Sequence, residues 1–290
     1  MMKVGILASG NLGLHTIKMC IDIVKPLFIA TDKGSDGIIF FAKEQHIPIF
    51  IGNPRNGKLR LFIKEHKFDI IFSINYLFLI KKDIIQLAKY PINFHGSLLP
   101  KYRGRTPHVW SIINNETNTG ITAHIIDENC DTGDVVLQKE IPIKANDTGA
   151  IILEQYNDLY PSMVKEVLNL VVNDKLQLTP QNNNVASYFG KRTPEDGLIK
   201  WFWQKERIRN WVRAQAFPYP GAFAMIEGEK IVIDKIDFLE HTFDYEMPDG
   251  LILQDSPKIL VKTSNGVIEL KSIRTNINLC KKGKIFEYEN

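Results

Sequence analysis

The sequence predicts an α/β protein with a doubly wound, mostly parallel sheet, followed by a smaller antiparallel β domain. Three observations carry this prediction. Residues 3–8 form a near-continuous apolar run that ends in glycine-rich sequence, which is typical of a strand buried on both faces of a parallel sheet. Strand-like and helix-like patterns then alternate five times up to residue 95. Beyond residue 214 the patterns are almost all strand-like.

The N-terminal part follows a strand–helix repeat in chain order. Because parallel strands joined by helices need right-handed crossovers, the repeat predicts a doubly wound sheet whose ligands bind at the carboxyl ends of the strands. Polar residues should therefore gather at three strand ends, near residues 9–11, 75–76 and 93–95. The expected strands are residues 3–8, 26–32, 47–51, 68–75 and 91–95, and the expected helices are Leu12–Val24, Ile38–Gln45, Leu59–His66 and Asp83–Tyr90.

The remaining chain completes the first domain and forms the second. A polar, aperiodic stretch at residues 179–193 is the candidate linker. We therefore expect one domain over residues 1–185 and a β-rich domain over residues 186–290, with a hairpin at Ser264–Gly266. The further expected elements are helices Pro107–Asn114, Gly149–Asn173 and Glu206–Ala214, and strands 120–127, 134–143, 222–227, 230–236, 251–254, 258–263 and 267–273.

Composition excludes several classes of protein. The chain has 290 residues, 44% of them hydrophobic and 24% charged, which is typical of globular proteins, and no apolar stretch is long enough to span a membrane. The net charge of +3 is too small to indicate nucleic acid as the main partner. The three cysteines are widely separated, so they form no metal-ligand pair, and we expect a cytoplasmic protein without a metal.

The glycine-rich turn after the first strand has three interpretations. Gly10 and Gly13 flank a helix start, and Asp32 ends the second strand, so the pattern partly matches a dinucleotide fingerprint. The match is incomplete, because the first G-x-G pair of the fingerprint is missing. An NAD-dependent oxidoreductase is therefore the least favoured interpretation of this turn. The turn is either an ordinary first turn of a parallel sheet or a place where a substrate phosphate or sugar hydroxyl meets a helix N-terminus. If the turn binds a substrate phosphate or sugar hydroxyl, the substrate would contact Ser9, Gly10 and Asn11.

The strongest chemical signal is the end of the fifth strand. Asn93 and His95 are two residues apart on a strand, so their side chains point to the same side. Asp131 lies in a glycine-containing turn between two later strands. An amide N–H stabilises an oxyanion, an imidazole moves a proton, and a carboxylate orients the imidazole, which together suit acyl transfer.

Each residue alone also has a simpler interpretation. His95 could be a buried core histidine, and Asp131 could be a turn former beside Gly133. No serine or cysteine lies in a nucleophile-elbow pattern, so direct transfer between two bound substrates is favoured over a covalent acyl-enzyme.

The motifs around these residues resemble a known family. The chain is similar to the family of formyltransferases that use 10-formyltetrahydrofolate in three stretches, INFHGSLLPKYRGRTP, ETNTGITAHIID and CDTGDVV. It also resembles the second domain of the methionyl-tRNA and sugar-nucleotide members of that family, in RTPEDGLIKW and RNWVRAQAFPYPGAF. The resemblance implies a Rossmann-like catalytic domain, an OB-like C-terminal domain and formyl transfer to an amine. It also implies that Asn93 holds the formyl oxygen, that His95 is the general acid or base, and that Asp131 pairs with His95. The folate would be bound by Leu77, Phe78, Leu79, Leu98, Leu99, Pro100, Arg105, Asp127 and Asp131.

The identity of the amine is argued from charge. Residues 191–290 carry 16 basic and 15 acidic side chains, which is a poor surface for tRNA. We therefore expect a nucleotide-linked amino sugar as the acceptor, contacted by Lys101, Tyr102 and Arg103, and no nucleic-acid or membrane partner.

Kinship favours dTDP-4-amino-4,6-dideoxyglucose, used in O-antigen or other surface-polysaccharide synthesis, and a homodimer. Three alternatives stay open: methionyl-tRNA formyltransferase, an NAD-dependent oxidoreductase, and a protein that binds or hydrolyses folate without an amine acceptor.

Overall fold

The computed structural model describes residues 2–64 and 66–287. The chain divides into two compact units that interleave along the sequence. The first comprises Met1–Pro107, Thr119–Ile141 and Glu154–Phe189, and the second comprises His108–Asn118, Pro142–Leu153 and Gly190–Asn290. The domain boundary expected after residue 185 stays a prediction.

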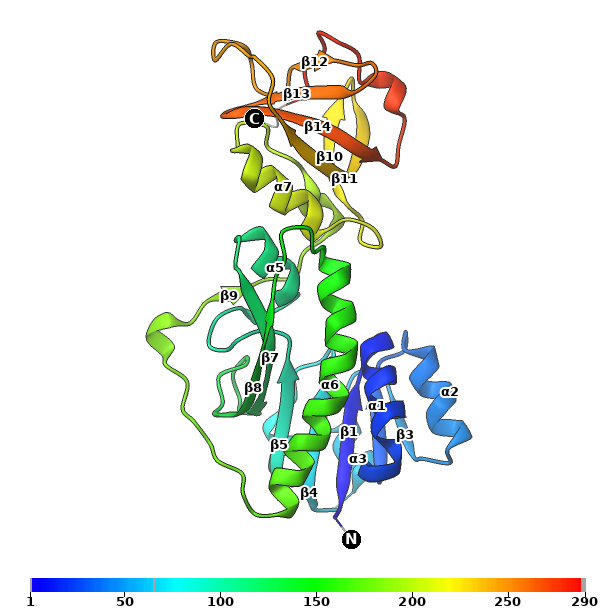
Figure 1. Cartoon of the computed structure of the whole chain (residues 1–290). Coiled ribbons are helices and arrows are strands. Elements are labelled where there is room, and N and C mark those ends of the chain that lie inside the picture. Colours follow the sequence, from blue (N-terminus) through cyan, green and yellow to red (C-terminus); the bar gives the residue numbers. More distant parts are fainter. Residues whose placement is uncertain (1, 65, 288–290) are drawn as a thin grey trace. The chain divides into compact units, whose positions relative to one another are not determined.

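The first unit is built on a seven-stranded sheet with the order β3-β2-β1-β4-β5-β7-β8 (Figure 1). Strands β1 to β5 pair in parallel, and β7 runs antiparallel to β5. This confirms the predicted doubly wound, mostly parallel sheet. The strands are β1 (Val4–Ala8), β2 (Phe28–Thr31), β3 (Ile49–Ile51), β4 (Phe68–Ile74), β5 (Ala88–His95), β7 (Asn118–Ile125) and β8 (Val135–Pro142).

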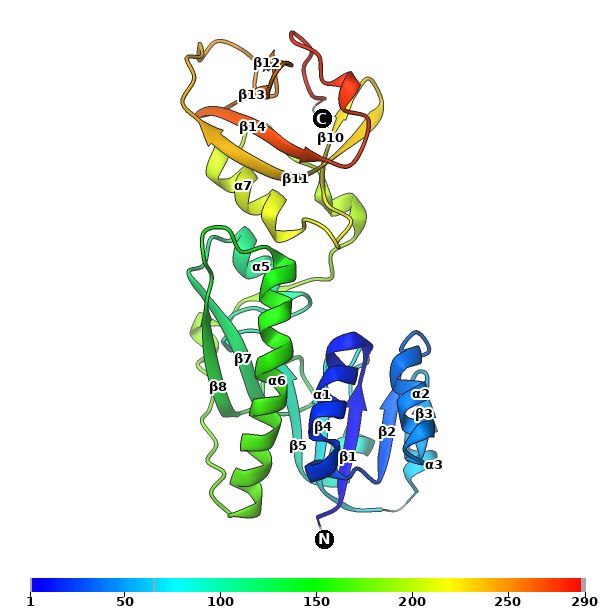
Figure 2. The ribbon, with the colours of Figure 1, turned by 45° about the vertical axis from the view of Figure 1, so that its right-hand side comes forward.

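Helices cover the sheet because each has one apolar face. In α1 (Gly10–Val24), Leu12, Ile17 and Cys20 are buried, and the helix ends where Lys25 adopts a left-handed φ of 43° before Pro26. Figure 2 shows α1 and the long helix α6 (Gly149–Val172) running across the same face of the sheet. The other helices that precede β5 in the chain are α2 (Asp36–Glu44), α3 (Lys58–Ile63) and α4 (Lys82–Ile85). Helix α5 (Pro107–Ile113) follows β5 in the chain, and its residues from His108 onward belong to the second unit.

Helix α6 fixes the end of β5 from this face. The Tyr156 hydroxyl donates to the Gly96 carbonyl at 2.8 Å, and the Tyr160 hydroxyl donates to the Phe94 carbonyl at 3.3 Å. Both tyrosines are buried, so these bonds form in a low-dielectric interior where they are strong. The carboxyl end of β5 is therefore held on a rigid support.

The predicted boundary between the fourth helix and the fifth strand was wrong. The helix expected over Asp83–Tyr90 ends at Ile85, and β5 already begins at Ala88. Ala88 pairs with Phe68, and Tyr90 pairs with Ile70, in the parallel register of β4 and β5. Backbone pairing with β4 therefore overrides the helical pattern of this short apolar run.

The second unit holds a five-stranded antiparallel sheet with the order β10-β11-β14-β13-β12, which confirms the predicted β-rich domain. Its core includes Trp201, which is fully buried and stacks on Phe286 with ring centroids 4.7 Å apart. Thr263 pairs with Gly266, so the hairpin predicted at Ser264–Gly266 joins β13 to β14. The elements are α7 (Lys205–Ala214), β10 (Ala222–Ile226), β11 (Glu229–Leu239), β12 (Ile252–Gln254), β13 (Ile259–Thr263) and β14 (Gly266–Ile273).

Short elements complete the chain. β6 (Arg103–Gly104) pairs in parallel with β9 (Tyr188–Phe189). Of the two strands, β9 lies within the stretch of residues 179–193 that was expected to be a linker. Three 3₁₀ helices are η1 (Asn183–Val185), η2 (Pro194–Gly197) and η3 (Ile277–Leu279). Within residues 2–64 and 66–287, no helix has the length and apolar character needed to cross a membrane.

Candidate active site

The two polar residues at the end of β5 occupy the position that the sequence predicts. Asn93 and His95 follow the buried Ile92 and Phe94, and they lie between β4 and β7. Because the residues are two apart on one strand, both side chains lie on the same face of the sheet. His95 is only 7% exposed, so its ring is desolvated.

The turn between β7 and β8 brings Asp131 to the same place. Its Oδ2 atom lies 3.6 Å from His95 Nδ1, and the same oxygen accepts a hydrogen bond of 2.9 Å from the Gly104 backbone N–H. Its Oδ1 atom lies 3.5 Å from Asn93 Nδ2. The structure therefore gathers all three predicted catalytic residues into one cluster.

A backbone carbonyl sets the tautomer of His95. His95 Nε2 lies 2.7 Å from the Tyr102 carbonyl oxygen. A carbonyl only accepts hydrogen bonds, so Nε2 carries the hydrogen and donates it. Nδ1 is then the nitrogen that gains or loses a proton, and it faces Asp131.

Sequence reasoning missed a fourth member of the cluster, His124. Its Nε2 atom lies 3.1 Å from Asn93 Nδ2 and 3.5 Å from Asp131 Oδ1. Its Nδ1 donates to the Ile125 carbonyl at 2.8 Å, so Nε2 is free to accept from the Asn93 amide. His124 is thereby a fixed acceptor that orients Asn93. The signal lay in the register of β5 and β7, where His124 is directly opposite Asn93.

Burial and the neighbouring groups change the pKa of Asp131 in opposite directions. Burial raises the pKa of Asp131, but His95, His124 and the Gly104 amide lower it by more, so that the pKa lies well below the ordinary value of an aspartate. The carboxyl group is consequently ionised throughout the pH range in which proteins function.

For His95, burial has a larger effect on the pKa than the neighbouring groups have. Burial lowers the pKa of His95, and this effect exceeds the upward influence of Asp131 and of the Tyr102 carbonyl, while His124 lowers the pKa further. Asp131 therefore acts on His95 in the expected direction, yet the net pKa is below the ordinary value. The resting ring is neutral near pH 7, as a proton acceptor must be.

The residues expected to bind folate divide into exposed and enclosed groups. Leu77 is 44% exposed and Leu79 is 54% exposed, although both follow β4, which is buried except at Asp69. Arg105 Nη2 donates to the Leu77 carbonyl at 2.8 Å, which ties Arg105 to this loop. Phe78 is half-buried, and its ring packs edge-on against Tyr76. Exposed apolar side chains at the carboxyl edge of a sheet are a suitable surface for a flat aromatic ligand.

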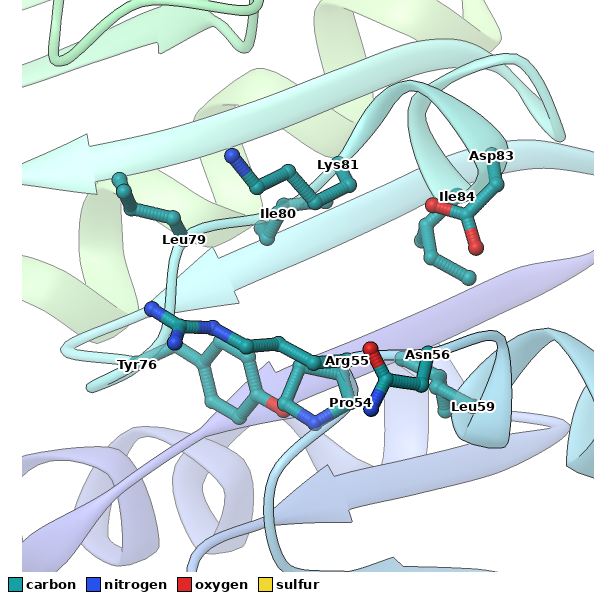
Figure 3. Close-up of a pocket in the computed structure, with 10 residues that line it drawn as sticks. All are labelled: Pro54, Arg55, Asn56, Leu59, Tyr76, Leu79, Ile80, Lys81, Asp83 and Ile84. Atoms are coloured by element: carbon teal, nitrogen blue, oxygen red, sulfur yellow. The ribbon is translucent and has the colours of Figure 1, made fainter.

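A small cavity lies beside this loop (Figure 3). It has a volume of about 40 Å³, and its lining includes Pro54, Arg55, Tyr76 and Leu79. The Tyr76 hydroxyl is buried and has no hydrogen-bond partner among the residues that the structure describes. The cavity has room for a few waters and not for a ring system.

The turn of Leu98, Leu99 and Pro100 is partly enclosed. Leu99 is 4% exposed, and its N–H donates to Thr122 Oγ1 at 3.1 Å, so it is part of the core. Leu98 and Pro100 are half-buried. Asp127 accepts from the Asn129 N–H at 3.0 Å and from the Thr132 hydroxyl, which shapes the turn that carries Asp131.

Of the residues expected to bind the nucleotide sugar, some are exposed and others are buried. Asn11 and Lys101 are exposed. Tyr102 is 7% exposed, and its ring stacks on Phe189 with centroids 5.0 Å apart. Arg103 is 1% exposed, and its guanidinium donates to Gln181, Asn183 and Tyr188. The side chains of Tyr102 and Arg103 thus have protein partners, and their contact with a nucleotide sugar stays a prediction.

The glycine-rich turn is likewise engaged within the protein. The Gly10 N–H donates to Ser35 Oγ at 2.8 Å, and Ser35 Oγ donates to Asp32 Oδ2 at 2.6 Å. The Gly34 N–H donates to Asp32 Oδ1 at 2.8 Å, and Ser9 is 1% exposed. Asp32 is thus occupied by neighbouring groups, which weighs against its holding a ribose in an oxidoreductase.

Metal chemistry has no visible ligand set in the described residues. No group of three or more His, Cys, Asp or Glu is arranged there to hold a metal ion. The clustered side chains are an amide, two imidazoles and one carboxylate, which is a set suited to proton transfer and oxyanion stabilisation.

Comparison with known proteins gives the family. Residues 51–168 match the family "Formyl transferase", and residues 191–281 match "Formyl transferase, C-terminal domain". A curated relative, the bifunctional polymyxin resistance protein ArnA of Wigglesworthia glossinidia brevipalpis, is 33% identical. The alignment covers 95% of this chain but only 43% of that protein, so the chain spans less than half the length of this relative.

Two solved structures share the fold over nearly the whole chain. WlaRD, a sugar 3N-formyl transferase with dTDP and 5-N-formyl-THF, has a TM-score of 0.74 at 22% identity and covers 95% of this chain and 99% of its own. An N-formyltransferase of Helicobacter canadensis with folinic acid and dTDP-3-aminofucose has a TM-score of 0.72 at 23% identity, covering 93% and 99%. The two matches together span most of the chain, and the first of them contains Asn93, His95 and Asp131, so the chain belongs to the formyl transferase family.

Proposed function

We propose that this enzyme transfers a formyl group from 10-formyltetrahydrofolate to the amine of a nucleotide-linked amino sugar. The observation that carries the proposal is the buried contact of His95 Nδ1 with Asp131 Oδ2 at 3.6 Å, beside the Asn93 amide. This is a proton acceptor with its counter-charge next to an oxyanion donor. The sugar acceptor is supported by the similarity to WlaRD and to the Helicobacter canadensis enzyme.

Asn93 is assigned to the formyl oxygen. Its amide has two hydrogens, and the 3.1 Å bond to His124 Nε2 uses one of them. The other faces Asp131 Oδ1 at 3.5 Å, a long contact that a nearer oxyanion would replace. Because His124 fixes the amide in advance, little reorganisation is needed as negative charge develops on the oxygen.

His95 is assigned to the proton. The attacking amine forms a bond to the formyl carbon and must lose one proton, which His95 Nδ1 accepts. Nε2 stays bonded to the Tyr102 carbonyl throughout, and Asp131 stabilises the imidazolium that forms. The same proton then passes to the leaving nitrogen of the formyl donor, so His95 returns to its neutral state.

The folate co-substrate supplies the formyl group. The residues that fit it are the exposed Leu77 and Leu79, the Leu98–Pro100 turn, Arg105 and the Asp127–Asp131 turn, all near the cluster or joined to it. Apolar side chains match the faces of a pterin, and the carboxylate and backbone groups match its polar edge.

The acceptor that we propose in detail is dTDP-4-amino-4,6-dideoxyglucose, for O-antigen or other surface-polysaccharide synthesis. Asn11 and Lys101 are exposed and suited to contact the nucleotide or its diphosphate, with the backbone near Ser9 and Gly10. We further propose a cytoplasmic homodimer that binds neither nucleic acid nor membrane. The nearly balanced charge of residues 191–290, with 16 basic and 15 acidic side chains, favours this acceptor over methionyl-tRNA.

The test is direct. The enzyme is incubated with 10-formyltetrahydrofolate and a panel of amino-sugar nucleotides, and products are analysed by mass spectrometry. We expect one acceptor to gain the mass of a single formyl group, and the His95→Ala variant to show almost none of this gain. No gain with any sugar nucleotide, together with formylation of methionyl-tRNA, would show that the acceptor is wrong.

A further inference from the structure

A segment that the sequence presents as a linker is bound to the catalytic loops. This anchoring segment, residues 179–189, begins with a bridge between Thr179 and Val135 on β8 and ends with β9 paired to β6. In between, the Ser187 backbone and side chain contact the loop of residues 100–105. The segment therefore contacts both loops that approach His95.

Gln181 lies at the centre of these contacts. Its Nε2 atom donates to the Asp131 carbonyl at 3.0 Å and to the Gly133 carbonyl at 2.7 Å. Its Oε1 atom accepts from Arg103 Nε at 3.2 Å and from Nη2 at 2.7 Å. Both amide hydrogens and the amide oxygen are used, so the side chain is locked between Arg103 and the turn.

The turn of Asp131 needs such support. Asp131 has a left-handed φ of 57°, a conformation that costs a non-glycine residue about 1 kcal/mol or more. Gly133 approaches the backbone so closely that a Cβ there would meet the Ile125 carbonyl oxygen. Backbone in an unfavourable conformation persists only where its surroundings hold it, and Gln181 supplies two of the hydrogen bonds that do so.

The same segment also fixes the partner of His95 Nε2. The Tyr102 N–H donates to Ser187 Oγ at 2.9 Å, and the Arg103 N–H donates to the Ser187 carbonyl at 2.9 Å. Tyr102 has a left-handed φ of 61°. The carbonyl that orients the His95 ring is thus placed by residues more than eighty positions later in the chain.

We propose that Gln181 is a positioning residue for formyl transfer, which holds the Asp131 carboxylate against His95 Nδ1 by clamping the Asp131 turn to the buried Arg103. This inference rests on the proposed function for its activity readout. The titratable groups that act on the charge of His95 are Asp131 and His124, beside the Tyr102 carbonyl. Of these, Asp131 is the one whose backbone Gln181 binds directly.

The test uses the full-length enzyme and the variant Gln181→Met, which keeps the side-chain length and removes every hydrogen bond. The matched control is Asn183→Ala, which removes another partner of Arg103 but touches neither Asp131 nor Gly133. We expect Gln181→Met to lower kcat about 10-fold or more with both KM values within about threefold, because small misplacements of catalytic groups are costly. The control should keep kcat within about twofold.

A second readout needs no turnover. In a histidine NMR titration, the His95 signal is assigned by its loss in His95→Ala. The pKa of His95 should fall in Gln181→Met, because the carboxylate that favours the charged ring moves away, and it should not change in Asn183→Ala. If the proposed sugar substrate is wrong, this titration result should still be obtained. A failure of the proposed function can therefore be told apart from a failure of the proposed role of Gln181.

Folding is controlled with a second variant. Gln181→Glu keeps an acceptor for Arg103 but turns repelling oxygens toward the two carbonyls, so it should fold and still lose kcat. The proposal is overturned if folded Gln181→Met retains wild-type kcat and an unchanged His95 pKa, or if Gln181→Glu retains wild-type kcat. It is also overturned if neither variant folds, since Gln181 would then support the fold as a whole.

Discussion

Replacing Asp131 with asparagine removes one charge from the cluster and little else. The asparagine oxygen can still accept the hydrogen bond from the Gly104 N–H. The side-chain volume is nearly unchanged. Asp131→Asn therefore isolates the electrostatic contribution of the carboxylate to the chemistry of His95.

The expected size of the effect follows from the distance. Across the 3.6 Å between His95 Nδ1 and Asp131 Oδ2, two unit charges at an effective dielectric constant of about 20 attract by about 5 kcal/mol. The dipole of the asparagine oxygen replaces part of this, so we expect a loss of about 2 to 4 kcal/mol. That corresponds to a kcat lowered about 30- to 1000-fold.

The assay is the pH dependence of kcat for formyl transfer, in the wild type and in Asp131→Asn. The carboxylate raises the pKa of His95, so its removal should lower that pKa and move the acidic limb of the profile to lower pH. The double variant with His95→Ala should be little worse than the worse single variant, because residues that act as a unit are non-additive. Losses that simply multiply, with an unmoved acidic limb, would refute the pairing and leave Asp131 as a turn former.

The remaining predictions concern other parts of the molecule. His95→Ala should fold normally and lose kcat by about 100-fold or more, measured by turnover and thermal melting. His124→Phe keeps the ring but removes the acceptor for Asn93, and should lower kcat about 10-fold with the same folate affinity in a calorimetric titration. Burial lowers the pKa of His108 from 6.5 to about 4, so the unfolded chain binds a proton that the folded one does not. Stability should consequently fall as pH drops through this window, by on the order of 2 to 3 kcal/mol in urea melts, and should fall less in His108→Gln. Finally, methionyl-tRNA should show no tight, salt-sensitive complex in filter-binding assays, and such a complex with efficient formylation would reverse the choice of acceptor.

The sheet could be predicted because strands buried on both faces leave a clear record in the sequence. Each of the first four strands is a mostly apolar run, and each is followed by a helix. The start of β5 could not be predicted in the same way. Residues 87–90 are compatible with a helix or a strand, and only their pairing with β4 decides between the two.

The catalytic cluster was predictable where chain neighbours carry the signal. Asn93 and His95 share one strand, and Asp131 lies in a recognisable turn. His124 was missed because its position depends on the register of β7 against β5, which no local pattern fixes. The hydrogen bonds of Arg103 to Gln181 could not be predicted, because Gln181 lies 78 residues later in the chain and no local pattern brings the two together.

The central claim is that the cluster formylates a sugar amine and not an aminoacyl-tRNA. The most direct measurement compares kcat/KM for dTDP-4-amino-4,6-dideoxyglucose and for methionyl-tRNA in parallel, with 10-formyltetrahydrofolate saturating in both. The account predicts that the sugar nucleotide is favoured by about 1000-fold or more, since a site that binds a sugar and diphosphate leaves its polar groups unpaired with the wrong acceptor. Equal or greater kcat/KM for methionyl-tRNA, or release of formate from the folate without any acceptor, would contradict it.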